Sequence, residues 1–194
     1  MFGAGNVEMF TPLPTHDEMA RLLGLERWEI GAHHTSAQGG GGVWADALWV
    51  IEGEPSFEDR WSLAGLLALN YGPAGEGPPW RRMVLAQGDE SALIEVDADP
   101  VFEALNRLEL LCPSPYWYTD GIGYSVRVKT NALSGEFHVS NPDTPSLIAL
   151  EAAALELAER AVRASRGRLT RVVQVWRQYA WSPPGGPVEL QCEE

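Results

Sequence analysis

The sequence is poor in cysteine and contains no long apolar run. Its 194 residues include two cysteines, Cys112 and Cys192, which are too few for a disulfide framework and match no zinc-ligand spacing. No stretch approaches the roughly 18 apolar residues that a membrane span needs. The first ten residues carry Glu8 and no basic segment, which is untypical of a secretory signal. We therefore expect a protein of the reducing cytoplasm.

Basic side chains are also scarce. The chain has 27 acidic and 14 basic residues, which gives a formal net charge of −13. Such a charge repels nucleic acid and anionic membranes, and it favours either simple solubility or a basic protein partner. Residues 160–181 are the exception, because they hold six arginines and no acid. We expect this arginine-rich segment to pack against the acidic body of the protein.

Apolar and aromatic residues are abundant by contrast. Hydrophobic residues, counted together with the aromatic residues and cysteine, make up 45% of the chain, and eight of them are tryptophans. A chain of this length and composition can bury the core of one ordinary domain. We therefore predict a single domain over residues 1–181, followed by an acidic, mobile tail over residues 182–194.

Helix signals occur at four places. Thr15 and Glu18 form a capping box, and Gly24 closes the helix that this box opens. The pairs Asp99-Pro100 and Thr144-Pro145 each place proline at a first helical position. The four expected helices cover residues 16–23, 56–70, 100–112 and 145–164.

Strand-like runs lie between these helices and mostly come in pairs. The runs are residues 28–34 with 43–51, 82–87 with 92–97, 124–130 with 136–140, and a last run over 169–180. Hairpins that alternate with helices predict an α+β protein with an antiparallel or mixed sheet of about six to seven strands and about four helices. We expect the helices to cover one side of the sheet, with ββα-type units as a possible organisation.

His33, His34 and Asp46 are the candidates for a metal site. Neutral imidazoles and a carboxylate are suitable ligands for zinc or another divalent ion. Adjacent residues on a strand point to opposite faces, so both histidines cannot easily serve one metal, and the remaining arrangement is one of them together with His16 or Asp46. An enzyme that uses these residues on a small molecule, with or without a metal, is our second hypothesis for the function. Our first hypothesis, a binding protein, requires no cofactor.

Two glycine-rich segments and the cysteines lack the context that catalysis needs. Gly39–Gly42 and Gly121–Gly123 are each followed by a strand-like run, whereas phosphate and dinucleotide loops open a helix. The sequence contains no GxSxG motif, and Cys112 lies on the apolar face of its expected helix. No motif therefore identifies a reaction, and we regard an enzyme as less favoured than a binding protein.

The hairpin over residues 124–140 gives the best candidate binding surface. Strand alternation predicts that one set of polar side chains projects together on one face, opposite the apolar set. This polar set comprises Ser125, Arg127, Lys129, Glu136 and His138. Three of its members are candidate partner-binding residues, namely Arg127, Lys129 and His138.

Two further features bear on this hypothesis. Tyr116, Trp117 and Tyr118 follow Pro115 in an expected loop, where aromatic residues are typical anchors of a protein interface. Glu151 falls on the apolar stripe of the longest helix, where a carboxylate needs a partner. We expect Glu151 to have a structural partner, such as an arginine, rather than a catalytic role.

The segment from Asp120 to Val162 resembles the C-terminal half of small bacterial α+β proteins, a group that includes immunity proteins of polymorphic-toxin systems. The resemblance is architectural, covers about a fifth of the chain, and depends on Asp120-Gly121, Tyr124, Asn141-Pro142 and the helix that follows. It implies a small acidic module that binds a partner protein through an acidic, aromatic-bearing surface. A nucleic-acid mimic is the last alternative, and the scattered acids disfavour it.

Overall fold

The computed structural model describes residues 13–31, 33–35, 42–72, 75–76, 79–109 and 121–180. Its helices are α1 (His16–Leu23), α2 (Pro100–Leu105), α3 (Pro145–Ala164) and α4 (Thr170–Tyr179). Its strands are β1 (His33–Thr35), β2 (Gly42–Pro55), β3 (Trp61–Gly72), β4 (Gly75–Glu76), β5 (Trp80–Gln87), β6 (Glu90–Val96), β7 (Ile122–Thr130) and β8 (Ser134–Ser140).

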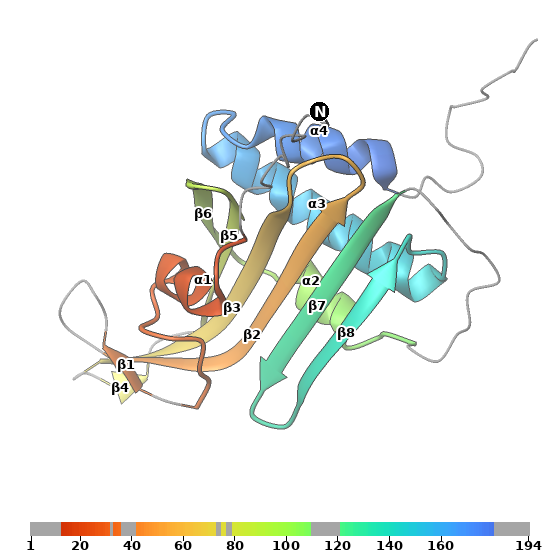
Figure 1. Ribbon diagram of the computed structural model, residues 1–194. Helices are drawn as coiled ribbons and strands as arrows, with labels where there is room; N and C mark the ends of the chain where they lie inside the picture. Colours follow the sequence, from red (N-terminus) through yellow and green to blue (C-terminus); the bar gives the residue numbers. More distant parts are fainter. Residues whose placement is uncertain are drawn as a thin grey trace, which may run out of the picture.

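Six of the strands form an antiparallel sheet in the order β6-β5-β3-β2-β7-β8 (Figure 1). The short strand β1 pairs with β2, and β4 pairs with β3. This sheet and the four helices confirm the predicted α+β class. None of the helices in the described ranges combines the length and the apolar character needed to cross a membrane.

The sheet has a hydrophobic core on each face. On one face α2, α3 and α4 cover the sheet, and Trp176 of α4 stacks on Trp61 of β3 with ring centroids 3.8 Å apart. On the opposite face α1 buries Met19 and Leu23 in a second core shared with β2, β3 and β5, and its main contacts are with β3, β5 and β6. The expectation that helices cover one side is therefore wrong for α1, which packs on the other side.

The predicted helix over residues 56–70 is wrong, because this segment turns at Ser56 and then forms β3. Strand β3 lies between β2 and β5, so it is buried on both faces and reads as a continuous apolar run from Leu63 to Leu69. Periodicity alone cannot distinguish such a run from a buried helix. The neighbouring strands decide the outcome, because they satisfy the backbone hydrogen bonds of β3.

The predicted strand over residues 169–180 is also wrong, because Thr170–Tyr179 forms α4. Its valines favour a strand by propensity. In the helix Val172, Val173 and Trp176 lie at a spacing that faces the core, and all three are buried. Tertiary packing of this apolar face outweighs the β-propensity of the segment.

The other main elements agree with the sequence. The capping box of Thr15 and Glu18 opens α1, and Gly24 closes it with a φ of 94°. Helix α3 covers the predicted residues, with Thr144 as its N-cap, and the hairpins β5–β6 and β7–β8 lie where they were expected. Helix α2 ends at Leu105, and the run predicted over residues 28–34 contains only the beginning of β1. Cys112 and the predicted tail, 182–194, lie outside the described residues.

Candidate functional site

The candidate site lies on the sheet face that carries α1, beside that helix. Strand alternation places the polar side chains of β7 and β8 on this face and sends Tyr124, Val126 and Val128 toward α3. The register sets Ser125 opposite both Glu52 of β2 and His138 of β8, and it sets Arg127 opposite Glu136. The projection predicted for this hairpin is therefore confirmed, and β2 adds a carboxylate to it.

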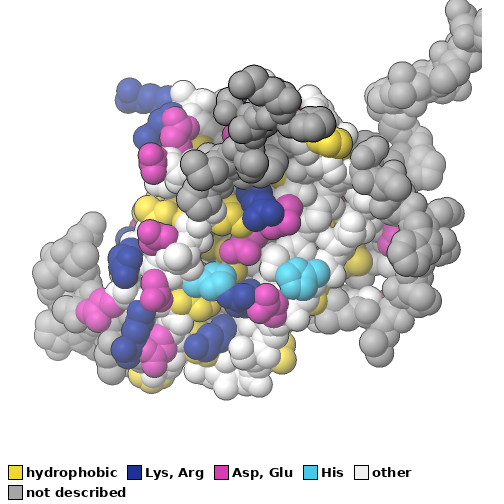
Figure 2. Space-filling model, in the orientation of Figure 1, with side chains coloured by type: hydrophobic (Ala, Val, Ile, Leu, Met, Phe, Trp, Pro, Cys, Tyr) yellow, Lys and Arg dark blue, Asp and Glu magenta, His cyan; other side chains and the backbone are white. Residues whose placement is uncertain are grey.

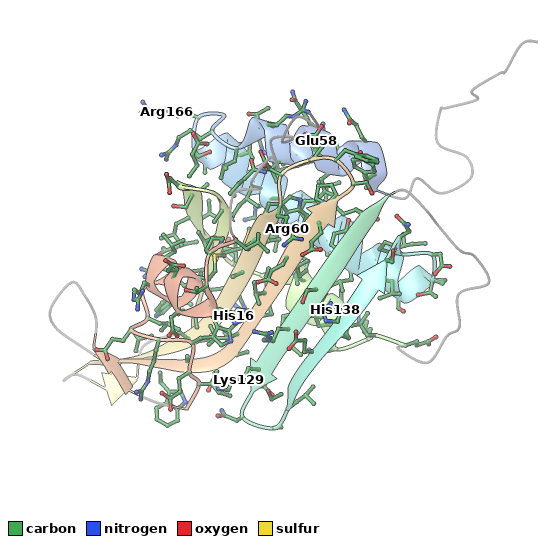
Figure 3. All side chains as sticks on the ribbon, viewed as in Figure 1. His16, Glu58, Arg60, Lys129, His138 and Arg166 are labelled. Atoms are coloured by element: carbon green, nitrogen blue, oxygen red, sulfur yellow. The ribbon has the colours of Figure 1, made fainter. Side chains whose placement is uncertain are left out.

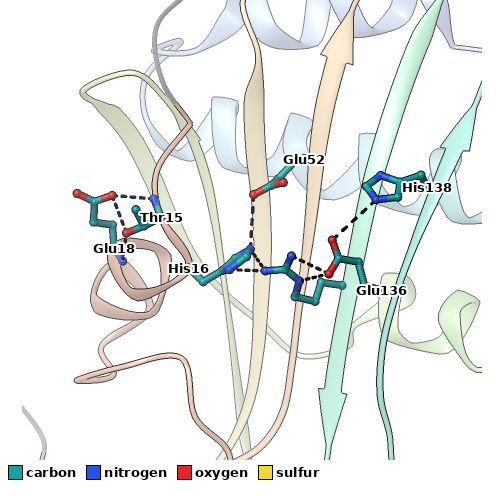
Figure 4. A network of polar contacts seen from close by, with 7 residues as sticks. Thr15, His16, Glu18, Glu52, Glu136 and His138 are labelled. Atoms are coloured by element: carbon teal, nitrogen blue, oxygen red, sulfur yellow. Dashed lines mark hydrogen bonds and ion pairs between the residues drawn. The ribbon is translucent and has the colours of Figure 1, made fainter.

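Five side chains form a continuous polar chain across this face, which we call the His16 network (Figure 4). Its members, in spatial order, are Glu52, His16, Arg127, Glu136 and His138. His16 Nε2 lies 3.6 Å from Glu52 Oε1 and 2.7 Å from Arg127 Nη1. Arg127 donates from Nε and Nη2 to Glu136 Oε2, at 3.1 and 2.8 Å, and Glu136 Oε1 lies 3.8 Å from His138 Nε2.

His16 enters the network because it is the first residue of α1. The ring of His16 lies beside that of Trp28, with centroids 5.6 Å apart, and the backbone N–H of Trp28 donates to Asp17 Oδ1 at 2.9 Å. The start of α1 is thereby held over the sheet. From the sequence alone, His16 is only an auxiliary candidate for the metal site. No local pattern relates it to Arg127 and the other members of the network that lie more than a hundred positions away.

The network sets the charge of its members at neutral pH. Burial and the neighbouring Arg127 guanidinium lower the pKa of His16, so its ring is neutral at pH 7. Hydrogen bonds from Arg127 lower the pKa of the Glu136 carboxyl, which is therefore ionised. Arg127 thus joins a neutral imidazole to a fixed carboxylate.

A shallow hollow of about 500 Å³ opens next to the network, and we call it the Glu52 hollow. The residues that line it are Glu52, Glu54, Gly123, Tyr124, Ser125, Glu136, His138, Val139 and Ser140. Three carboxylates therefore border the hollow, and none of these lining residues is lysine or arginine. Figure 2 shows this face of the molecule, where two histidines lie among acidic and basic side chains.

Glu52 and Glu54 are functional candidates that the sequence analysis did not single out. Both lie at the end of β2, beyond the strand predicted over residues 43–51. Extending the alternation of that strand by two polar positions would have placed them on the face of Leu48 and Val50. Glu52 has only 20% of its side chain exposed, whereas Glu54 has 48%.

The remaining predicted partner-binding residues have different outcomes. Lys129 lies on β7 on the same face, in register with Leu48 and Ser134, so the structure brings it near Arg127 without placing it in the network. His138 is 74% exposed at the open end of the network. Tyr116, Trp117 and Tyr118 lie outside the described residues.

The structure adds little to the metal hypothesis. The backbones of His33 and His34 pair with Trp44 and Val43. Asp46 accepts a hydrogen bond from Asn131 Nδ2 at 3.4 Å. Across the part of the chain that the structure describes, no three histidine, cysteine, aspartate or glutamate side chains are grouped to hold a metal ion.

Glu151 is buried beneath the opposite face of the sheet, with 5% of its surface exposed. The hydroxyl of Tyr124 donates to its carboxylate, and burial followed by the Glu151 charge raises the pKa of that tyrosine. The void that Glu151 borders measures about 10 Å³, enough for about one water molecule and too small for a substrate. Glu151 therefore joins α3 to β7, with a tyrosine hydroxyl as its hydrogen-bond partner.

The arginine-rich segment, which we expected to pack against the acidic body, forms several ion pairs. Arg171 lies 2.5 Å from Glu58 of the β2–β3 turn, and Arg177 lies 2.5 Å from Glu159 of α3. Arg163 also contacts Glu159. Arg166 projects from the turn between α3 and α4, at the tip of the molecule (Figure 3). The segment therefore pairs partly with the acidic body and partly within the two helices.

Comparison of the chain with protein-family models, with curated proteins and with solved structures finds no match in any of the three.

Proposed function

We propose that this protein is an acidic binding module and that it holds basic side chains of a partner protein in the Glu52 hollow. The observation that carries the proposal is the composition of the hollow, which has three carboxylates and no cationic side chain in its described lining. A lysine or arginine entering from solvent would meet several acceptors at once. Charge-assisted hydrogen bonds of this kind are about twice as strong as neutral ones.

The flanking residues support this proposal by holding the carboxylates in place. Arg127 fixes Glu136 through two nitrogens, and Arg60 lies 3.4 Å from Glu54. Side chains that are already ordered lose little conformational entropy when a ligand binds. The hollow therefore resembles a prepared receptor for cations more than a freely solvated surface.

The net charge of the chain supports the same kind of partner. A molecule with a formal charge of −13 attracts basic proteins from a distance and accelerates their association. The architectural resemblance to immunity proteins suggests a basic toxin domain as one such partner. An accessory role beside another basic protein would use the same surface.

A random peptide library displayed on phage tests this function. The wild-type protein should enrich peptides that are rich in lysine and arginine. The variant Glu52→Gln/Glu54→Gln/Glu136→Gln, which removes the three carboxylates, should lose this enrichment. A matched control, Glu103→Gln/Glu109→Gln/Glu156→Gln, makes the same change in net charge on the helical side of the molecule and should behave as wild type.

Two outcomes would contradict the proposal. One is enrichment of acidic or uncharged peptides by the wild-type protein. The other is an equal loss of enrichment in the hollow variant and in the control, because it would mean that net charge rather than the Glu52 hollow attracts the peptides. Circular dichroism of each variant would show whether the fold is retained.

A further inference from the structure

The turn between β2 and β3 carries the most exposed large apolar side chain of the described residues. Phe57 has 87% of its surface exposed, compared with 59% for Leu133 and 47% for Leu93. Its backbone has a φ of 66°, in the left-handed region that favours glycine and asparagine. Phenylalanine therefore costs conformational strain here, of order 1 kcal/mol, and gains no burial in return. The fold alone gives no reason for this residue.

The backbone around Phe57 is held from two sides. The N–H of Ser56 donates to the carbonyl of Gly121 at 2.8 Å, and the hydroxyl of Tyr179 donates to the carbonyl of Ser56, also at 2.8 Å. On the other side of the turn Glu58 pairs with Arg171, and Gln87 donates to the carbonyl of Asp59 at 3.3 Å. The backbone of the turn is thus held by contacts on both sides, while the phenyl ring itself remains in solvent.

A ring presented on a rigid backbone suits an interface anchor. Aromatic side chains supply a large apolar area, and an anchor whose backbone is already fixed loses little entropy on binding. A single exposed ring is common on protein surfaces, but here the exposure is combined with a left-handed backbone conformation that phenylalanine rarely adopts. The strain, the exposure and the bracing of Phe57 therefore point to the same role.

The turn also adjoins the Glu52 hollow. Arg60, at the end of the turn, pairs with Glu54, which lines the hollow. Glu58 and Arg60 lie at this end of the β2–β3 hairpin, toward α4 (Figure 3). An occupant of the hollow that extends along β2 in this direction reaches the turn that carries Phe57.

We infer that Phe57 is the apolar anchor of the same interface, and that the partner presents an apolar pocket next to basic side chains. The inference rests on the proposed function for the basic half of this description. A second copy of this chain is a poor occupant, because two molecules that each carry −13 repel one another. The partner is therefore a basic protein with an exposed apolar pocket.

The test compares Phe57→Gly with the wild-type protein in the same peptide selection. Glycine relieves the strain at φ 66°, so the melting temperature of this variant should equal or exceed that of wild type. Wild-type protein should enrich peptides that combine lysine or arginine with apolar residues, whereas Phe57→Gly should enrich basic peptides without the apolar component. A wild-type-selected peptide should bind Phe57→Gly about tenfold or more weakly. Leu93→Ser, which alters an exposed apolar residue on β6, is the control and should bind as wild type.

The outcomes separate this inference from the proposed function. If the hollow variant loses binding while Phe57→Gly retains the wild-type affinity and selectivity, the anchor role is overturned and the acidic receptor stands. If Phe57→Gly loses binding while the hollow variant retains it, the acidic receptor is overturned and the anchor stands. A Phe57→Gly protein that melts at a lower temperature than wild type would assign Phe57 to the fold and overturn the inference.

Discussion

The indole of Trp49 on β2 lies over Gly65, the residue directly opposite it on β3. A Cβ atom on Gly65 would be 2.2 Å from Cε2 of this indole, which no real contact allows. The arrangement is repeated in reverse four residues along the hairpin, where Trp61 of β3 lies over Gly53 of β2. Two glycines thus let two tryptophans lie flat against the centre of the sheet.

We expect Gly65→Ala to destabilise the protein by about 1–3 kcal/mol, because the new methyl group displaces a fully buried indole. Urea unfolding followed by tryptophan fluorescence measures this change. Gly135→Ala on β8 is the matched control, since its Cβ would lie 4.0 Å from Val128 Cγ1, an ordinary contact. Equal effects of the two substitutions would mean that the Trp49–Gly65 contact does not limit stability.

The contact between Trp49 and Gly65 illustrates why some parts of the fold could be predicted from the sequence and others could not. Local signals were sufficient for α1, α3 and the hairpins β5–β6 and β7–β8, because caps, turns and alternation are encoded within a few residues. Strand β3 was not predictable in this way. Its apolar run fits a buried helix as well as a central strand. Gly65 would weaken a helix, whereas in the strand it leaves room for the indole of Trp49. The pairing of β3 with β2 and β5, which also places Trp49 over Gly65, distinguishes the two.

The candidate site shows a similar division. Alternation within β7 and β8 predicted that Arg127 and His138 share a face, because the hairpin brings near neighbours in sequence together. His16 joins them through the packing of α1 on the sheet, and Glu52 joins them through the pairing of β2 with β7, and both depend on contacts between residues far apart in the chain. The sequence therefore indicated one edge of the site, and the fold completes it.

Tyr124 supports the buried carboxylate of Glu151, so Tyr124→Phe should cost about 1–3 kcal/mol of folding free energy. The loss arises because the carboxyl group of Glu151, with 5% of the residue exposed, would lack one hydrogen-bond partner. Tyr179→Phe is a suitable control, because it removes a hydroxyl that donates to the half-buried carbonyl of Ser56 and should cost less. In a Glu151→Met background the effect of Tyr124→Phe should largely disappear. An unchanged effect in that background would show that the Tyr124 hydroxyl stabilises the fold through another group.

Asp99 links the start of α2 to the sheet, since its two oxygens accept from the N–H of Phe102 at 2.9 Å and from Trp49 Nε1 at 2.7 Å. Asp99→Ala removes the helix cap and leaves a buried indole N–H without its acceptor. We expect a loss of about 2–3 kcal/mol from these two effects together, measured by chemical unfolding. Asp97→Ala, two residues earlier and exposed, should be nearly neutral. A loss below about 0.5 kcal/mol in Asp99→Ala would show that the Trp49 contact contributes little.

His16 makes stability depend on pH near neutrality. Its pKa in the folded state lies below the ordinary value of 6.5, because of burial and of Arg127, although Glu52, Glu136 and Asp17 oppose the shift. As the pH falls through 6.5, the unfolded chain therefore binds a proton more readily than the folded protein. The contribution of His16 to stability is complete above this pH and is lost as the pH falls toward the lowered folded pKa.

Unfolding by urea from neutral pH down to about pH 5 should show a steeper loss of stability for wild type than for His16→Gln. A His16→Gln slope equal to that of wild type would mean that burial and Arg127 do not hold the ring in its neutral form.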